Sequence, residues 1–356
     1  MTFTARVTAI TQDRILPSET DNFFGDTSFI PYRFLGNGES WGGETLKVPV
    51  TLGGNNNGGS FQGMSSVQIG VPQTRQAMQY NVKAHRQSIA VPGLEKIANK
   101  GEERIVNMLS ADIHTAFESM LERVSTDLYG DGTGNSGMAF NGFNNLLTDS
   151  TIASTIGGLS RSTYTTLNGT VTDIGGAIAL DDMATFSMDL RSGSGMKNKP
   201  TAYICGETVW NYLEKLIITG TVQANYQTQG YPTVTRKSKG AIRGSELNGG
   251  YGFDSILFRT IPIIFDEACP ANVLWGVNEN YVTFYGAKSD DLKSITIPQG
   301  IEGTANDRPT DDIGLQWTGW KDAYAEFGEL AILYLFGEFV TTQPRRNGKL
   351  INITGV

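Results

Sequence analysis

The apolar residues between Glu102 and Leu128 recur at helical spacing and predict the longest helix of the chain. One face of this helix carries Ile105, Leu109, Ile113, Ala116, Met120, Val124 and Leu128. Such a stripe has to be buried against another element, so we expect a sheet beneath the helix. Gly130 is expected to end the helix as a carboxy-terminal cap.

Alternating apolar positions predict strands over much of the remaining chain. Residues 44–52 place an apolar side chain at every second position, and Pro49 restricts this strand to a sheet edge. Further strands are predicted at 82–91, 201–205, 256–258, 261–265, 273–275, 281–285, 294–297, 314–320, 324–339 and 350–353. Shorter helices are predicted at 94–99, 178–190 and 207–216. One long helix, a few short helices and many strands indicate the α+β class.

The first 80 residues lack the material for a core of their own. Residues 1–32 show no sustained period, and residues 33–80 form a long two-stranded excursion with a Gly- and Asn-rich tip at 53–59. Because an isolated hairpin is marginal in water, we expect both segments to lie on a neighbouring surface, in this chain or in another subunit. The candidate contact residues in these segments are Phe23, Phe24, Phe29, Trp41, Lys47 and Phe61.

Composition excludes several classes of protein. The chain has 28 Lys and Arg against 36 Asp and Glu, a net charge of −8, which argues against a dedicated nucleic-acid binder. Two cysteines, Cys205 and Cys269, cannot form a disulfide scaffold, and two histidines leave little for a metal site or a proton relay. The longest apolar run, 330–336, is far short of the about 18 residues that span a bilayer. Together with a start that lacks an apolar signal segment, this predicts a cytosol-like, reducing location.

Two glycine motifs occur in contexts that argue against their best-known functions. Residues 132–137 match GxGxxG, but they follow a helix and enter a loop, whereas a dinucleotide site needs a strand before the motif. Residues 38–42 match GxSxG around Ser40, but a strand follows them where a nucleophile elbow needs a helix. A turn explains both segments better than catalysis does.

The remaining candidate sites are weaker. Asp131, Thr133 and Asn135 resemble the start of a calcium loop, but its bidentate Glu would fall at Gly142. A basic cluster favours a solvated loop or a charge contact with a partner over phosphate binding, and it consists of Arg236, Lys237, Lys239 and Arg243. We therefore expect no catalytic residue, no cofactor and no metal.

The order of several short motifs is more specific than any one of them. A hairpin at 46–50 with Phe61 and Gly63 precedes the long helix, which ends in the segment 127–134. A strand–helix step follows at 203–213, and then come the runs 261–266 and 269–276. In this order, which covers nearly the whole chain, the sequence resembles tailed-phage major capsid proteins of the Hong Kong 97 fold.

The resemblance implies a division of the chain into five parts. They are an N-terminal arm at 1–32, an extended loop at 33–80, a peripheral domain at 81–165 with a spine helix at 102–128, an axial domain at 166–284, and a return to the peripheral domain with the C-terminal strands at 285–356.

The resemblance also implies a structural, non-enzymatic function. Copies of the chain would form the hexamers and pentamers of an icosahedral shell around double-stranded DNA, assembled in the host cytoplasm and found in the virion. A portal protein would occupy one vertex, and decoration proteins are further candidate partners. The net charge of −8 suits a shell that encloses DNA without binding its sequence.

Two features of the family have no clear counterpart here. Some members begin with a charged scaffolding segment that is cut away, so the start of this chain implies a separate scaffolding protein or a trimmed chain. Some members crosslink a hairpin Lys to an Asn of another subunit. Lys47 is the only Lys of the hairpin before Lys83, and no partner Asn or catalytic acid for it is evident.

Three alternatives stay open. An encapsulin-like compartment would use the same fold to enclose enzymes instead of DNA. A β-rich serine hydrolase would use Ser40 as its nucleophile. A lectin-like module is compatible with the Gly, Asn and Tyr content, although the long helix argues against it.

Overall fold

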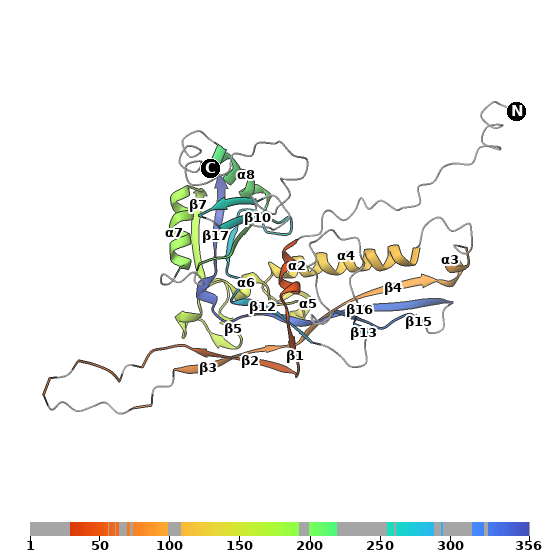
Figure 1. Cartoon of the computed structure of the whole chain (residues 1–356), viewed down its shortest axis with the longest axis horizontal. Coiled ribbons are helices and arrows are strands. Elements are labelled where there is room, and N and C mark those ends of the chain that lie inside the picture. Colours follow the sequence, from red (N-terminus) through yellow and green to blue (C-terminus); the bar gives the residue numbers. More distant parts are fainter. Residues whose placement is uncertain are drawn as a thin grey trace.

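A long helix lies along a twisted sheet in the computed structural model of the chain (Figure 1). The helix is α4 (Met108–Leu128), and it packs on strand β4 (Lys83–Pro92). The structure describes residues 29–55, 57–60, 62–63, 70–71, 74–98, 108–191, 199–218, 255–259, 261–287, 293–294, 315–323 and 327–355. Within these ranges, no helix combines the length and the apolar character that a membrane crossing requires.

The predicted apolar stripe of α4 is confirmed where the structure describes it. Ala116, Met120, Val124 and Leu128 are all buried, while the start of the predicted range lies outside the described residues. The helix ends just before Gly130, as predicted, and the backbone N–H of Gly130 donates to the carbonyl of Asp127 at 2.9 Å, but the positive φ after the helix belongs to Gly132, at +80°.

The sheet beneath α4 has seven strands. Its centre is β16 (Gly328–Thr341), which pairs antiparallel with β4 from Lys83↔Gly337 to Pro92↔Gly328. Strand β12 (Val282–Ala287) lies on the other side of β16 and pairs in parallel with β1 (Glu39–Trp41). The remaining members are β14 (Leu315–Trp317), β13 (Lys293–Ser294) and β15 (Lys321–Asp322).

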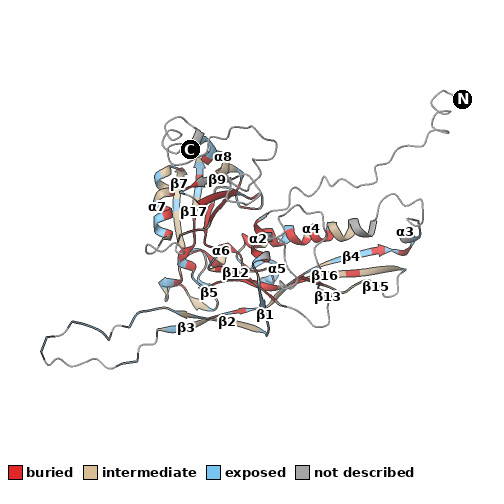
Figure 2. Cartoon of the chain, in the orientation of Figure 1, coloured by how far each residue is buried: buried red, intermediate tan, exposed pale blue. Residues whose placement is uncertain are grey.

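A second sheet has six strands and its own apolar core. Its strand order is β7 (Thr170–Ala177), β17 (Gly348–Gly355), β11 (Leu274–Val277), β8 (Ala202–Cys205), β10 (Ile261–Phe265) and β9 (Ser255–Phe258). Two helices, α7 (Leu180–Leu190) and α8 (Glu207–Ile218), contribute Phe186, Val209 and Leu213 to the core beside this sheet. Figure 2 shows the buried residues gathered in these two regions.

The remaining short elements lie between the longer helices and strands. They are α3 (Gly93–Ala98), α5 (Gly134–Gly137), α6 (Phe143–Leu146), β5 (Thr155–Ile156), β6 (Leu159–Ser160), η1 (Thr165–Leu167) and η4 (Pro344–Arg346). The GxGxxG segment follows α4, as the sequence predicts, and its last four residues form the single turn α5, in which Asn135 and Ser136 have positive φ.

Three described elements differ from the sequence-based expectation. Helix α2 (Phe29–Gly36) crosses the predicted boundary between the arm and the extended loop. The segment around Ser40 forms strand β1 instead of a turn, with Ser40 opposite Gly286. Strand β17 pairs with β7 and β11, so the last strand of the chain lies in a sheet formed by residues of the range 166–284.

Candidate assembly site

A two-stranded hairpin extends away from both sheets (Figure 1). It consists of β2 (Thr45–Thr51) and β3 (Arg75–Asn81), paired antiparallel from Thr45↔Asn81 to Thr51↔Arg75. Strand β2 alternates as predicted: its apolar side chains pack against the main core, while Lys47 and Pro49 are exposed. The hairpin therefore has one face on its own chain and one face open.

The root of this hairpin is part of the main core. Met78 is 0 % exposed and Tyr80 is 3 % exposed. The backbone N–H of Gln79 donates to the carbonyl of Gly157 at 2.9 Å, which attaches β3 to the turn between β5 and β6. Gly157 also lies so close to β3 that an added Cβ would be 2.5 Å from Met78 Cβ.

The outer part of the hairpin contrasts with its root. Residues 52–74 contain no Asp, Glu, Lys or Arg, although 18 % of the whole chain is charged. Most of the described positions in this segment are exposed, and Val71 is 95 % exposed. The outer part is therefore uncharged and largely exposed.

A buried arginine organises the segment under the hairpin root. Arg161 is 0 % exposed, and its guanidinium donates to the carbonyls of Asn145, Leu146, Thr148 and Leu167. Burial lowers the pKa of Arg161 to about 10. The loop 145–167 is therefore closed around one cation, which no sequence pattern indicated.

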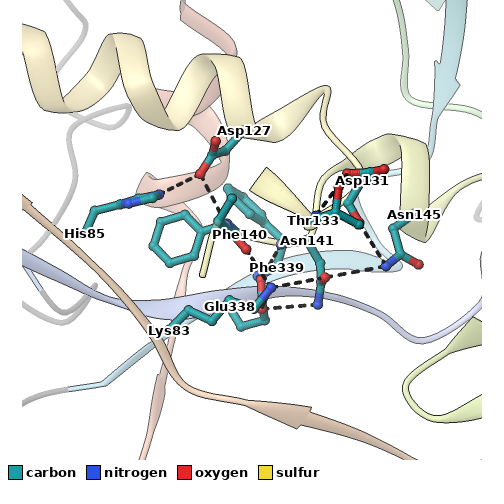
Figure 3. A network of polar contacts seen from close by, with 11 residues as sticks. Lys83, His85, Asp127, Asp131, Thr133, Phe140, Asn141, Asn145, Glu338 and Phe339 are labelled. Atoms are coloured by element: carbon teal, nitrogen blue, oxygen red, sulfur yellow. Dashed lines mark hydrogen bonds and ion pairs between the residues drawn. The ribbon is translucent and has the colours of Figure 1, made fainter. Parts of the chain in front are cut away.

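A polar network joins the hairpin root to the seven-stranded sheet (Figure 3). Lys83, the first residue of β4 after the hairpin, forms an ion pair with Glu338 of β16 at 3.2 Å. The same Lys83 Nζ donates to the carbonyl of Ala139 at 2.5 Å and to Asn141 Oδ1 at 3.3 Å. Asn141 in turn donates to Glu338 through its backbone N–H at 2.7 Å and through Nδ2 at 3.1 Å.

Glu338 is the most buried member of this network. Its side chain is 0 % exposed, and burial raises the pKa of its carboxyl to about 7, although the nearby Lys83 ammonium acts in the opposite direction. A carboxylate without solvent needs several donors, and Lys83, Asn141 and the backbone N–H of Phe339 provide them.

A second pair attaches β4 to the end of α4. His85 Nε2 lies 2.7 Å from Asp127 Oδ2, and the backbone N–H of Phe140 donates to the same oxygen at 3.2 Å. The His85 ring also meets the ring of Phe140 edge-on, with centroids 4.2 Å apart. His85 therefore serves packing and positioning, and the described residues hold no cluster of His, Cys, Asp and Glu that suits a metal ion.

Two of the predicted contact residues have described side chains. Trp41 is 7 % exposed on β1, and Lys47 is exposed on β2. The backbone of Phe29 begins α2. The others lie outside the described residues: Phe23, Phe24, Phe61, Arg236, Lys237, Lys239 and Arg243. Their role in contacts between subunits stays a prediction.

The C-terminal basic residues are part of the fold. Lys349 Nζ donates to Asn144 Oδ1 at 2.6 Å and lies 4.8 Å from the centroid of the Trp275 ring. Arg346 is 7 % exposed. These two side chains are therefore used within the chain, which does not favour a phosphate site at this position.

Comparison with known proteins rests on structure. No protein-family model matches the chain, and no curated protein sequence does either. The capsid asymmetric unit of cyanophage A-1(L) contains a chain that is 13 % identical, with a TM-score of 0.67, and the match covers 99 % of this chain and 100 % of that one. This chain has the fold of phage capsid proteins. The resemblance predicted from the sequence is thereby confirmed.

Two further matches cover this capsid fold along its whole length. The capsid of a native GTA particle matches with 9 % identity and a TM-score of 0.58, over 99 % of this chain and 98 % of that one. The SrpI encapsulin of Synechococcus elongatus matches with 11 % identity and a TM-score of 0.55, over 99 % and 96 %. Capsids and an encapsulin therefore both match this chain in fold.

Proposed function

We propose that this chain is the major capsid protein of a tailed phage. The observation that carries the proposal is the end-to-end match to the cyanophage A-1(L) capsid chain, which covers 99 % of this chain and 100 % of that one. The extended hairpin supports it, because an arm of this length is stabilised by a surface outside itself. Copies of the chain would assemble into hexamers and pentamers of an icosahedral shell.

In the proposed Hong Kong 97-type arrangement, each part of the chain has one task. Residues 1–32 are the arm and 33–80 the extended loop, and both reach a neighbouring subunit. Residues 81–165 and the return from 285 form the peripheral domain around α4, and residues 166–284 form the axial domain. The apolar core beside the six-stranded sheet supports the axial unit, and it also takes in Leu350 and Ile353 of β17.

The proposed shell encloses double-stranded DNA and is not an enzyme. A net charge of −8 supports this, because few phosphate contacts would hold the genome to the wall. Ser40 lies in strand β1 and not at a strand-to-helix turn, which weakens the hydrolase alternative. A separate scaffolding protein, a portal protein and decoration proteins are proposed partners, with assembly in the host cytoplasm.

Assembly of the purified full-length chain tests the proposal. The chain would be expressed alone and with the scaffolding candidate from the same gene neighbourhood, and the particles would be imaged by electron microscopy. Capsomers or closed shells are expected. A chain that stays monomeric under both conditions would contradict the proposal.

An encapsulin-like compartment is the second candidate, and the SrpI match favours it specifically. The two functions differ in the contents of the particle. Particles isolated from the native source would be treated with nuclease and then opened. Protected double-stranded DNA supports the phage capsid, whereas a co-purifying enzyme with a shared targeting peptide supports the compartment.

A further inference from the structure

Lys83, Asn141 and Glu338 come from three separate segments and meet side chain to side chain (Figure 3). Lys83 Nζ is 3.3 Å from Asn141 Oδ1 and 3.2 Å from Glu338 Oε2. Asn141 Nδ2 is 3.1 Å from the same Glu338 oxygen. An amine, a carboxamide and a carboxyl group are thus held in mutual contact.

The surroundings of these three groups exclude most water. Glu338 is fully buried and the Lys83 side chain is 17 % exposed. Phe140, Phe284 and Phe339 are each 0 % exposed, and their ring centroids lie 5.0–6.1 Å apart beside the network. In such a setting, proton transfer between a cation and a carboxylate costs less than in water, because the neutral pair needs no solvation.

Further contacts position the carboxamide for attack. Asn145 Nδ2 lies 3.4 Å from Asn141 Oδ1, on which negative charge would develop, and the carbonyl of Ala139 accepts a hydrogen bond from the Lys83 amine. Gly132 leaves room for the amide, because a Cβ there would lie 2.2 Å from Asn141 Oδ1. The carboxamide is therefore fixed from several directions before any reaction begins.

We propose that Lys83 and Asn141 form an isopeptide bond within one chain, with Glu338 as the catalytic acid and base. Glu338 takes a proton from the Lys83 ammonium, and the free amine attacks Cγ of Asn141. The new bond is Nζ–Cγ, and the bond that breaks is Cγ–Nδ2. Glu338 returns its proton to Nδ2, which leaves as ammonia, and then takes the second proton that Nζ loses as it becomes an amide nitrogen. No oxidant, reductant or other reactant takes part.

The properties of Glu338 suit this double role. Its carboxyl has a pKa of about 7, raised by burial, so it can hold and release a proton near neutral pH. Its Oε2 contacts both the attacking nitrogen and the leaving nitrogen. One oxygen can therefore serve both proton transfers without moving between distant partners.

The bond would fasten the hairpin root to the body of the same chain. Lys83 follows β3 after a single residue, whereas Asn141 lies in the loop after α4. This differs from the crosslink considered for Lys47, which would join two chains. It rests on side-chain geometry alone and is tested separately from the capsid function.

Mass spectrometry of the full-length protein tests the proposal. The folded chain, kept at neutral pH and then denatured, is expected to weigh less than its sequence by one molecule of ammonia. A tryptic digest is expected to give one branched peptide that joins Lys83 to Asn141. A chain at its full sequence mass, without the branched peptide, would overturn the proposal, and this measurement needs no variant.

Three variants sharpen the result, with circular dichroism to confirm that each one folds. Lys83→Arg keeps the positive charge but removes the nucleophile, and Glu338→Gln removes the proton carrier; both are expected at full sequence mass. Lys47→Arg is the matched control and is expected to keep the branched peptide. Because Asn141 precedes Gly142, a succinimide would also release ammonia. Loss of ammonia that persists in Lys83→Arg would assign it to the succinimide and overturn the bond.

Discussion

The root and the outer part of the β2–β3 hairpin differ in what surrounds them. At the root, Met78 and Tyr80 are buried, and β3 bonds to the turn at Gly157. In the outer part, the described residues are mostly exposed and the segment 52–74 carries no charge. The hairpin therefore begins inside a core and continues into solvent (Figure 2).

This difference separates two tasks within one element. Contacts at the root contribute to the stability of the single chain, because they bury apolar area and satisfy backbone groups. The described residues of the outer part have few such contacts, so we expect this part to serve contacts with other molecules. Changes at the root are therefore expected to alter the free energy of unfolding, and changes in the outer part are expected to alter assembly.

Removal of the outer part is expected to have the largest effect, which is a loss of assembly without a loss of stability. Leu52 N–H donates to the carbonyl of Thr74 at 2.7 Å, so replacement of residues 53–73 by Asn-Gly closes a two-residue hairpin at this pair. We expect shells to be lost in electron micrographs. The free energy of unfolding is expected to stay level or to rise by about 1–2 kcal/mol, because a shorter loop loses less entropy.

A truncated chain that still forms shells of normal size would contradict the assignment of the outer part to assembly. A truncated chain that unfolds readily would instead place stabilising contacts in the outer part. Either result would remove the distinction between the two ends of the hairpin.

Truncation of a buried root side chain is expected to reduce stability strongly. Met78 is 0 % exposed, and Met78→Ala should lower the free energy of unfolding by about 2–5 kcal/mol, since it removes buried methylene groups and leaves a cavity. Denaturant titration of the unassembled chain measures this. Gln76→Ala on the exposed part of the same strand is the matched control, with an expected change of under about 0.5 kcal/mol.

Protonation of Glu338 is expected to make root stability depend on pH. The carboxyl has a pKa of about 7 in the folded chain against an ordinary value of 4.5. Between these values the folded chain holds a proton that the unfolded chain has lost. The free energy of unfolding therefore falls as pH rises through this interval, by roughly 3 kcal/mol from this group, and levels off above it.

The measurement uses Lys83→Arg, which keeps a cation beside Glu338 and cannot form the isopeptide bond. Denaturant titrations at a series of pH values would be compared with the double variant Lys83→Arg, Glu338→Gln. Other titrating groups cancel in the difference between the two curves. Curves that run parallel across the interval would show that Glu338 does not hold the proton.

Elements with a regular apolar period could be predicted from the sequence, whereas polar contacts between distant segments could not. The stripe of α4 could be predicted because Ala116, Met120 and Val124 repeat on one helix face. Helix α2 was missed because Pro31 looked like an interruption, although a Pro in the first turn of a helix loses no hydrogen bond. Strand β7 was missed because Gly175 and Gly176 obscure its alternation.

The network around Lys83 could not be derived from spacing. Asn141 and Glu338 are 197 positions apart, and His85 and Asp127 are 42 apart, so no local pattern connects them. One feature of the sequence did indicate a buried polar contact. Glu338 lies between Gly337 and Phe339 in the buried last part of β16, and a charge in a buried stretch of strand indicates a buried partner.

The smallest expected effect tests the contact between β3 and the turn beneath it. Gly157 and Gly158 both have positive φ, at +53° and +78°. Either one changed to Ala should cost about 1–2 kcal/mol for the left-handed conformation. Gly157→Ala should cost roughly 1–3 kcal/mol more, because its Cβ would collide with Met78, whereas a Cβ at Gly158 meets nothing within 4 Å.

The difference between these two variants isolates the contact from the backbone strain they share. Thermal and denaturant unfolding of both chains would be measured side by side. An equal loss of stability in the two variants would mean that β3 moves away from the added Cβ without a loss in the free energy of unfolding. The contact between β3 and the turn would then contribute little to stability. A larger loss in Gly157→Ala, together with unchanged unfolding of the arm-truncated chain, would locate the stabilising contacts of the hairpin at its root.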